Sequence, residues 1–251
     1  MKTYTNITPM KIVKLAAVIA LTAATLFANA QIFSRGIVGN GEMGKRVFKL
    51  SSFKNVSVSS GIDLYLDPSG KNQAELVTDK NVISAVEVIQ EGNTLIFKLK
   101  EGIRKTTKGI KIYLSYKTLE GIKASGGSDV YTKDNTAIKG QSLSIEASGG
   151  ADIRLTIDVE SLKCETSGGS DTYLKGSANF ATFDCSGGSD VKAKELATQT
   201  CSIESSGGSD AIVTATKSVK IDASGASDVT YYGNPKSISV SKSGASDVYR
   251  K

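Results

Sequence analysis

One aspartate recurs at a nearly fixed interval through the second half of the chain. It closes a five-residue phrase, Ser-Gly-Gly-Ser-Asp or a close variant, and successive copies lie 18 to 23 residues apart. The aspartates are Asp129, Asp152, Asp171, Asp190, Asp210, Asp228 and Asp247. Stacked carboxylates could bind Ca²⁺, which prefers oxygen ligands. However, the phrase differs from the nonapeptide of calcium-binding β-rolls. We therefore expect no metal site, with turn amides and serine hydroxyls balancing the charge.

A second file consists of the residues that lie two positions after each aspartate. Its members are Tyr131, Arg154, Tyr173, Lys192, Ile212, Thr230 and Tyr249. Aromatic rings interleaved with cations could stack a sugar or bind an acidic glycan. The ligand-binding candidates are therefore Tyr131, Arg154, Tyr173, Lys192 and Tyr249. The alternative is ordinary cross-strand packing on an exposed sheet, which needs no ligand.

Catalysis has little support in the sequence. The chain contains no histidine, which excludes His-based triads and histidine metal sites. Glycosidases use paired carboxylates, but here the aspartates recur uniformly and no repeat stands out as an active site. We expect a non-enzymatic protein with no catalytic residue and no cofactor. Two alternatives stay open: a glycan-active enzyme that uses the Asp and Tyr files, and a purely structural envelope component.

The pattern around each phrase predicts the elements that carry these files. Apolar residues precede the phrase at every second position, as in Leu143, Ile145 and Ala147, and follow it in the same way, as in Ile153 and Leu155. Period two predicts two strands per repeat with one buried face, and a third, weaker strand could form around 157–159. Successive repeats stacked at about 4.8 Å make a parallel β-helix. We expect an all-β solenoid with coils of about 19 residues over 121–251. It should be right-handed, because the coil lengths vary.

The first glycine of the phrase is present in every copy, which predicts a positive φ or a crowded backbone there. These structural glycines are Gly126, Gly149, Gly168, Gly187, Gly207, Gly225 and Gly244. The second glycine is replaced by Ala226 and Ala245 in the last two copies, so we expect an ordinary φ at that position.

The three cysteines, Cys164, Cys185 and Cys201, fall at inward positions. Their offsets along the strands place them too far apart for a disulfide, so we expect buried thiols. Lys242 and Arg250 also occupy inward positions, but in the last repeat. These charges would block pairing at an open sheet edge, or else they mark an interface through which the protein forms a homo-oligomer.

Residues 1–30 have the features of a secretory signal peptide. Lysines precede an apolar run over 15–27, and Ala28-Asn29-Ala30 follows as a cleavage site. The run is too short to span a membrane. We expect export to the periplasm or cell surface, no transmembrane span, and a flexible Gly-rich segment over 31–44. Removing three lysines with this peptide lowers the net charge from +6 to +3, too little to indicate a nucleic-acid partner.

Residues 45–120 contain seven short alternating runs bounded by turn residues, which predicts strands. The runs are 46–50, 55–59, 62–66, 74–78, 86–90, 94–100 and 110–116. One helical turn could form over 79–85. The phrase Ser59-Ser60-Gly61-Ile62-Asp63 is a degenerate copy of the repeat. We expect irregular β coils that cap the N-terminal end of the solenoid.

From about residue 45 onward the chain resembles the bacterial family of auto-transporter adhesin head domains, or GIN domains. The resemblance is carried by 53–58, 60–64, 93–97 and 119–126, followed by the run of Ser-Gly-Gly-Ser-Asp coils. It implies an exported, β-helical cell-envelope protein with an adhesin role. We expect its partner to be a glycan or another envelope protein. It brings no catalytic residue.

Overall fold

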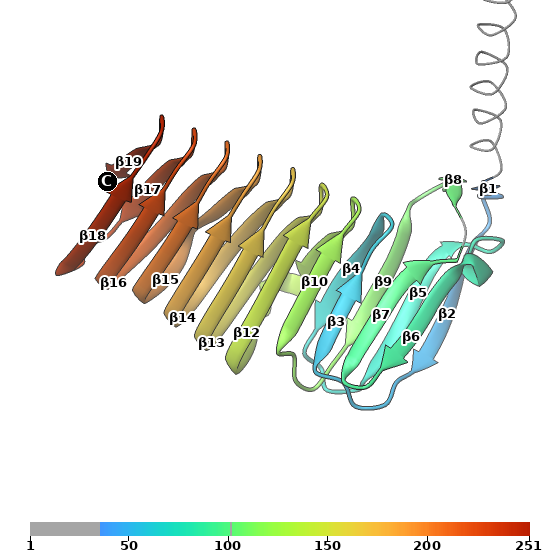
Figure 1. Cartoon of the computed structure of the whole chain (residues 1–251). Helices are drawn as coiled ribbons and strands as arrows, with labels where there is room; N and C mark the ends of the chain where they lie inside the picture. Colours follow the sequence, from blue (N-terminus) through green and yellow to red (C-terminus); the bar gives the residue numbers. More distant parts are fainter. Residues whose placement is uncertain (1–35, 101) are drawn as a thin grey trace, which may run out of the picture.

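The computed structural model describes residues 36–100 and 102–251 and shows an elongated, nearly all-β stack of coils (Figure 1). Residues 36–50 lie at one end of the stack and the C terminus lies at the other. The structure confirms the predicted β-solenoid. The predicted signal peptide, residues 1–30, lies outside the described residues. No helix in the described part of the chain is long and apolar enough to cross a membrane.

Each regular coil consists of strands that run along one wide face, turn a corner and return along the other. The strands are β10 (Gly121–Ser125), β11 (Asp129–Thr132), β12 (Ile138–Ser148), β13 (Asp152–Thr166), β14 (Asp171–Cys185), β15 (Asp190–Ser205), β16 (Asp210–Ala223), β17 (Asp228–Tyr232), β18 (Ser237–Lys242) and β19 (Asp247–Arg250). Along β13 every second residue is buried until Glu160 and Ser161, which are both exposed. This break in period marks the corner. The third strand expected around 157–159 is therefore the end of the first face.

Neighbouring coils pair in parallel and in register. Asp152 lies opposite Asp171, Leu155 opposite Leu174, and the same register continues from β10 to β19 with small shifts at bulges. All seven aspartates of the phrase face one another in sequence along the stack. The predicted files of like positions are therefore present.

The first glycine of the phrase has a positive φ in all seven copies, from 61° to 78°. A Cβ at Gly168 would lie 3.1 Å from the backbone nitrogen of Gly149 in the preceding coil, so both predicted constraints apply. The second glycine has an ordinary φ from the third copy on. The prediction is wrong at Gly127 and Gly150, where φ is 72° and 80°.

A backbone hydrogen bond between coils accompanies the ordinary φ in the last four turns. From the fourth copy on, the second residue donates its N–H to the carbonyl of the first glycine one coil back, as Gly188 does to Gly168 at 2.8 Å. Gly127, Gly150 and Gly169 make no such bond to a described residue, so the bond is not required for the ordinary φ of Gly169.

The serine before each aspartate ties the turn to its surroundings. It is buried in all six copies that contain it, namely Ser128, Ser170, Ser189, Ser209, Ser227 and Ser246. The Ser189 hydroxyl lies 2.9 Å from two carbonyl oxygens, those of Ser186 in its own turn and Thr166 in the preceding coil. The same two contacts recur at Ser209, Ser227 and Ser246. These hydroxyls therefore satisfy backbone carbonyls.

The N-terminal part continues the stack in an order that differs from chain order. Its elements are β1 (Ile37–Val38), β2 (Met43–Lys49), β3 (Asn55–Val58), β4 (Ile62–Asp67), β5 (Gln73–Asp79), η2 (Ile83–Ala85), β6 (Val86–Glu91), β7 (Thr94–Leu99), β8 (Ile103–Lys105) and β9 (Ile110–Ser115). β3 pairs with β10 on one side and β7 on the other, while β4 lies between β11 and β9. The coil 55–67 is therefore inserted between the coils 94–115 and 121–132.

Antiparallel strands close the N-terminal end of the stack. β5 pairs with β9, β2 pairs with β5, and β6 pairs with β7. The segment 31–44, expected to be flexible, contains β1, which pairs with β8, and the start of β2. The seven predicted strands of this region and its single helical turn, η2, are present.

Buried Asp79 holds this closure together. Its carboxylate accepts hydrogen bonds from the backbone N–H groups of Thr107 and Gly41, both at 2.8 Å, and from the Thr107 hydroxyl at 2.7 Å. The bonds from Thr107, with that from Gly41, hold the pKa of Asp79 below its usual value. One carboxylate thus joins the segment after β1 to the loop before β9.

The three cysteines are buried, as predicted. None of them faces another across the ladder, because Cys164 lies opposite Phe183, Cys185 opposite Thr166, and Cys201 opposite Ala181. Burial raises the pKa of the Cys164 and Cys201 thiols to about 12. They act as small apolar core residues.

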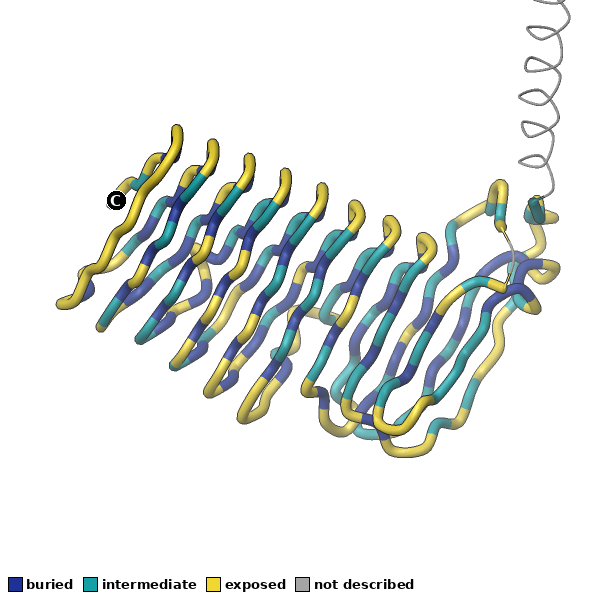
Figure 2. The backbone as a smooth tube through the Cα atoms, in the orientation of Figure 1, coloured by how far each residue is buried: buried dark blue, intermediate teal, exposed yellow. Residues whose placement is uncertain are grey.

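The C-terminal end of the stack is open. β18 is exposed along its whole length, which Figure 2 shows as an unbroken exposed strand. Lys242 and Arg250 lie in register with the inward residues Ala223 and Tyr231, as predicted. The Lys242 ammonium lies 3.5 Å from the Asp247 carboxylate, so charges cover this edge. A homo-oligomer through this end stays a prediction.

Candidate ligand-binding face

The outward residues two positions after each aspartate form one ladder on a wide face of the solenoid. Cross-strand partners place the predicted members Tyr131, Arg154, Tyr173, Lys192, Ile212, Thr230 and Tyr249 in consecutive coils. The structure adds Tyr65 beside Tyr131, and Tyr113 beside Tyr65. The ladder therefore begins with three consecutive tyrosines.

The rings of the ladder stack on one another and on cations. The Tyr65 ring centroid lies 5.0 Å from that of Tyr113 and 5.3 Å from that of Tyr131. The Arg154 guanidinium lies 4.7 Å from the Tyr173 ring centroid, and the Lys192 ammonium lies 4.8 Å from the same centroid. The ring faces are therefore occupied within the ladder. A sugar would meet ring edges and phenol hydroxyls.

The aspartate file runs beside the ladder, and the ladder supplies most of its donors. The Tyr131 hydroxyl donates to Asp129 at 2.8 Å, and the Arg154 guanidinium to Asp152 at 2.8 Å. Further along, the Tyr173 hydroxyl donates to Asp171 at 3.2 Å. We expected turn amides and serine hydroxyls in this role. Instead the serines satisfy carbonyls, because their side chains point inward, whereas residues two apart on a strand share a face.

No group of three or more metal-ligating side chains is placed to hold an ion within residues 36–100 and 102–251. Ladder cations offset the charge of Asp152, Asp171 and Asp190, whereas Asp210 accepts the backbone N–H of Asp228 at 3.2 Å. The Lys192 ammonium contacts two carboxylates of the file, that of Asp171 at 3.3 Å and that of Asp190 at 3.0 Å.

Two ladder residues, Tyr131 and Lys192, keep their protonated forms over the physiological pH range. Partial burial and the hydrogen bond to Asp129 raise the pKa of Tyr131 to about 12. Burial opposes the charge of Lys192, but hydrogen bonds to Tyr173, Asp190 and Asp171 raise its pKa above the usual value. Tyr131 therefore stays a hydrogen-bond donor and Lys192 stays a cation.

Three hollows follow the ladder on the side away from the glycine turns, and two of them share lining residues. The central hollow, about 420 Å³, lies between Tyr131, Arg154 and Tyr173 on one side and Asn135, Lys175 and Glu195 on the other. A C-terminal hollow of about 170 Å³ shares Tyr173, Lys175 and Glu195 and extends to Lys194 and Tyr232. An N-terminal hollow of about 270 Å³ lies beside Tyr65 and Tyr113. We call these three hollows the ladder groove.

Irregular repeats form the far rim of the ladder groove. The step from Asp129 to Asp152 is the longest, and its extra residues form η3 (Lys133–Asn135), where Asp134 and Asn135 have φ of 52° and 56°. The step from Asp190 to Asp210 contains a bulge, where the β14–β15 register shifts after Tyr173. Bulges re-aim side chains near binding sites. The two longest steps between successive aspartates thus indicate in the sequence where this rim lies.

The predicted site residues separate into two groups. Tyr131, Arg154, Tyr173 and Lys192 line the groove or its ladder side, whereas Tyr249 lies three coils beyond Lys192. Tyr65 could have been found from the sequence, because it follows Asp63 of the degenerate phrase as Tyr131 follows Asp129. Tyr113 follows no copy of the phrase and carried no such signal.

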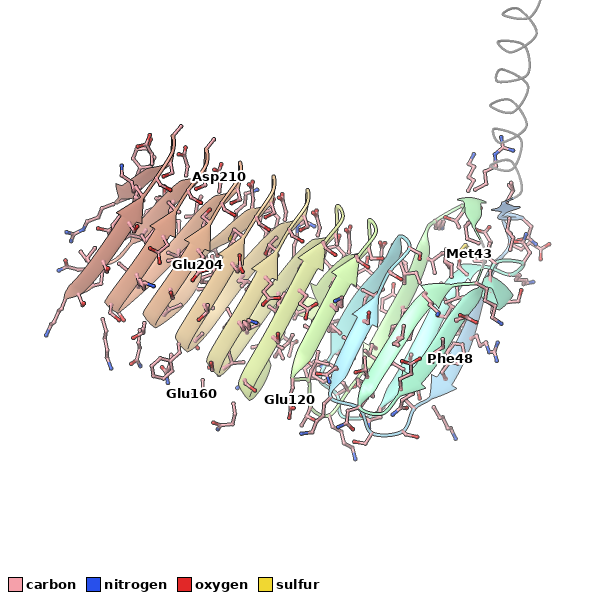
Figure 3. The ribbon with its side chains drawn as sticks, in the orientation of Figure 1. Met43, Phe48, Glu120, Glu160, Glu204 and Asp210 are labelled. Carbon is pink, nitrogen blue, oxygen red and sulfur yellow. The ribbon has the colours of Figure 1, made fainter. Side chains whose placement is uncertain are left out.

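The opposite wide face has a different chemistry. Its outward file is Glu146, Glu165, Asp184, Glu204 and Asp222. We call this the acidic face. Figure 3 shows Glu204 on the wide face toward the viewer, with Asp210 near the turn edge. Lysines accompany the file, with Lys123 pairing with Glu146 at 2.6 Å and Lys220 with Asp222 at 3.0 Å. It has no counterpart of the tyrosine ladder.

Comparisons with known proteins agree with this fold. No curated protein matches the chain. A crystal structure of a putative adhesin from Bacteroides fragilis NCTC 9343 is 24% identical, with a TM-score of 0.81, and the alignment covers 86% of this chain and 100% of that one. A putative adhesin from Parabacteroides merdae ATCC 43184 is 19% identical, with a TM-score of 0.66 and coverage of 86% and 99%.

A third solved structure carries a different description. It is called a putative lipid binding protein, from Parabacteroides distasonis ATCC 8503, and is 18% identical, with a TM-score of 0.67 and coverage of 86% and 100%. At these identities the likeness shows the fold alone. The family model described as "Putative auto-transporter adhesin, head GIN domain" matches residues 52–235, from the segment before β3 to the loop after β17. The chain therefore belongs to the GIN domain family of auto-transporter adhesin heads.

Proposed function

We propose that this protein is an exported, non-enzymatic binding module of the cell envelope, and that it holds its ligand in the ladder groove. One observation carries the proposal. Residues far apart in the chain, from Tyr65 and Tyr113 to Lys192, converge into one ladder beside three hollows, two of which share lining residues. Aromatic and charged side chains that converge on a hollow are typical of ligand sites.

Two further features support this role. The adhesin-like family is consistent with a surface or exported protein, and residues 1–30 have the sequence features of a signal peptide. The acidic face, built on the same coils, serves as an internal comparison because it lacks a tyrosine ladder. Coil stacking alone therefore does not require the ladder.

One observation favours the enzymatic alternative. Burial, together with the neighbouring Asp129 carboxylate, raises the pKa of Asp63, and paired carboxylates with separated pKa values occur in glycosidases. Neither residue lines the ladder groove. Release of reducing ends from envelope polysaccharide by the wild type, and its loss in Asp63→Asn, would establish this alternative. We expect no release.

The test of binding is a glycan array combined with envelope polysaccharide fractions. The test variant is Tyr131→Ala/Tyr173→Ala, and the control is Lys163→Ala/Lys220→Ala on the acidic face. We expect the tyrosine variant to lose binding while the control retains it. Circular dichroism and thermal melting of each variant separate loss of the site from loss of the fold. Equal binding by both variants would contradict the proposal.

A further inference from the structure

We infer that the ladder groove takes an anionic polysaccharide chain, lying parallel to the axis of the stack. This inference rests on the proposed function, because it names the ligand class for the same surface. It is carried by the charges that line the hollows, by their continuity along the coils, and by the occupants that the geometry excludes.

Cations dominate the central and C-terminal hollows. Their lining contains four cationic side chains, Arg154, Lys175, Lys192 and Lys194, and one carboxylate, Glu195. Arg154 and Lys192 already contact the aspartate file. Lys175 lies 3.9 Å from Glu195, with both side chains more than half exposed, which makes this ion pair weak.

Lys194 completes the cationic rim. Its ammonium lies 4.5 Å from the Tyr232 ring centroid, and no carboxylate of a described residue lies within ion-pair distance of it. Lys175 and Lys194 are therefore the cations with the most capacity left for a ligand carboxylate or sulfate. Both line the C-terminal hollow, where the β14–β15 register shifts.

The hollows continue from coil to coil. The central and C-terminal hollows share Tyr173, Lys175 and Glu195, and together they extend from β11 to β17. Five coil steps of about 4.8 Å give a groove of about 24 Å. A chain of several sugars fits this length and would meet cations in successive coils. Ring edges, the Thr156 hydroxyl and the Asn135 amide line the same path and can hydrogen-bond sugar hydroxyls.

Other polymeric occupants fit this surface less well. A peptide added as a strand needs a free sheet edge, but β14 beneath the groove is paired on both sides, with β13 and β15. Single-stranded nucleic acid needs open ring faces for base stacking, and the faces of Tyr131 and Tyr173 are covered by ladder neighbours.

The test uses matched polymers that differ only in charge. Polygalacturonate, alginate and hyaluronate are each titrated calorimetrically into the purified protein beside their methyl esters, which carry no carboxylate charge. The variants are Lys175→Gln/Lys194→Gln in the groove and Lys163→Gln/Lys220→Gln on the acidic face. We expect at least one acid polymer to bind, with about tenfold weaker binding of its methyl ester.

The groove variant should weaken binding of the acid polymer about tenfold, and the acidic-face variant should leave it unchanged. The inference is overturned if no acid polymer binds, if a methyl ester binds as well as its acid, or if the groove variant binds normally. If a neutral ester binds and Tyr131→Ala/Tyr173→Ala abolishes that binding, the proposed function survives without the anionic ligand. If no glycan depends on the ladder, both proposals fail.

Discussion

The cap coils (residues 53–115) and the regular coils (residues 121–251) build one stack in different ways. In the regular coils each turn follows the previous one along the chain and repeats the same phrase. In the cap, the coil 55–67 is inserted between two later segments. The tyrosine ladder nevertheless passes from Tyr113 through Tyr65 to Tyr131 without a break. Position in the stack, rather than order in the chain, decides which side chains share a face.

The two regions also differ in what holds them. The regular coils use glycines and serines that recur at every turn, so each coil is held in the same way as its neighbours. The cap depends on contacts made once, of which the three hydrogen bonds to the Asp79 carboxylate are the clearest. A substitution that disrupts one regular coil should therefore lower the free energy of unfolding of the whole stack. A substitution in the cap should raise hydrogen exchange only near the substituted residue.

The largest effect is expected at a crowded glycine within β14. Gly176 has a φ of 104°, and a Cβ there would lie 2.0 Å from the carbonyl oxygen of Ile157. Gly176→Ala should lower the free energy of unfolding by about 3 kcal/mol or more, as measured by urea denaturation. Gly169→Ala is the matched control, since Gly169 has an ordinary φ and open space. Similar free energies of unfolding for the two variants would contradict the crowding described at Gly176.

The next prediction concerns the cap and its pH dependence. The folded protein holds the pKa of Asp79 below its unfolded value, so this carboxylate stabilises the fold above the unfolded pKa, about 4. Its contribution is lost as the pH falls through the folded pKa. Asp79→Asn should melt at a lower temperature than wild type at neutral pH, and the gap should narrow in acid. Hydrogen exchange should rise in β1 and β8 and stay unchanged in β14. A uniform rise would contradict local damage.

Removal of one turn hydroxyl should have a smaller effect. Ser189→Ala removes the hydroxyl that contacts two carbonyls and should cost about 1–2 kcal/mol of unfolding free energy. Alanine already occupies the equivalent position at Ala151, so the fold should persist. Ser186→Ala, in the same turn, is the control and should be nearly neutral. Equal losses of unfolding free energy in Ser189→Ala and Ser186→Ala would contradict this role of the Ser189 hydroxyl.

The smallest effect tests the junction between the two regions. A double-mutant cycle of Tyr65→Leu and Tyr131→Leu should give a coupling energy of about 0.5–1.5 kcal/mol, because the rings stack across the junction. The pair Tyr113 and Tyr131 brackets Tyr65 without direct pairing and should show weaker coupling. Stronger coupling between Tyr113 and Tyr131 would mean that the coil order is different.

The sequence predicted the regular coils well because their information is local and repeated. Period-two burial, the glycine turns and the inward cysteines follow from spacing within a single coil. The strands of the cap were also predicted, but their pairing was not, since apolar alternation does not specify which strands become neighbours. The donors that balance the aspartate file were missed, although Arg154 and Lys192 each lie two residues after an aspartate on the same face of the same strand. Only the contact of Lys192 with Asp171 in the preceding coil depends on the register.

The candidate site could be predicted only in part. Tyr131, Arg154, Tyr173 and Lys192 were found as one file, because they share a repeat position. The groove beside them depends on η3 and on the β15 bulge, and repeat averaging hides both. The far rim of the ladder groove is formed by the two repeats whose lengths depart from the average, so a pattern averaged over all repeats does not reveal it.

Amine labelling followed by mass spectrometry tests the central claim most directly. The purified protein is labelled with and without the polysaccharide fraction of the envelope. The account predicts joint protection of Lys133, which lines the N-terminal hollow, and of Lys175 and Lys194 in the C-terminal hollow. Lys163 and Lys220 on the acidic face should label equally in both samples. Protection of the acidic face, or of neither face, would contradict the assignment of the ladder groove as the binding surface.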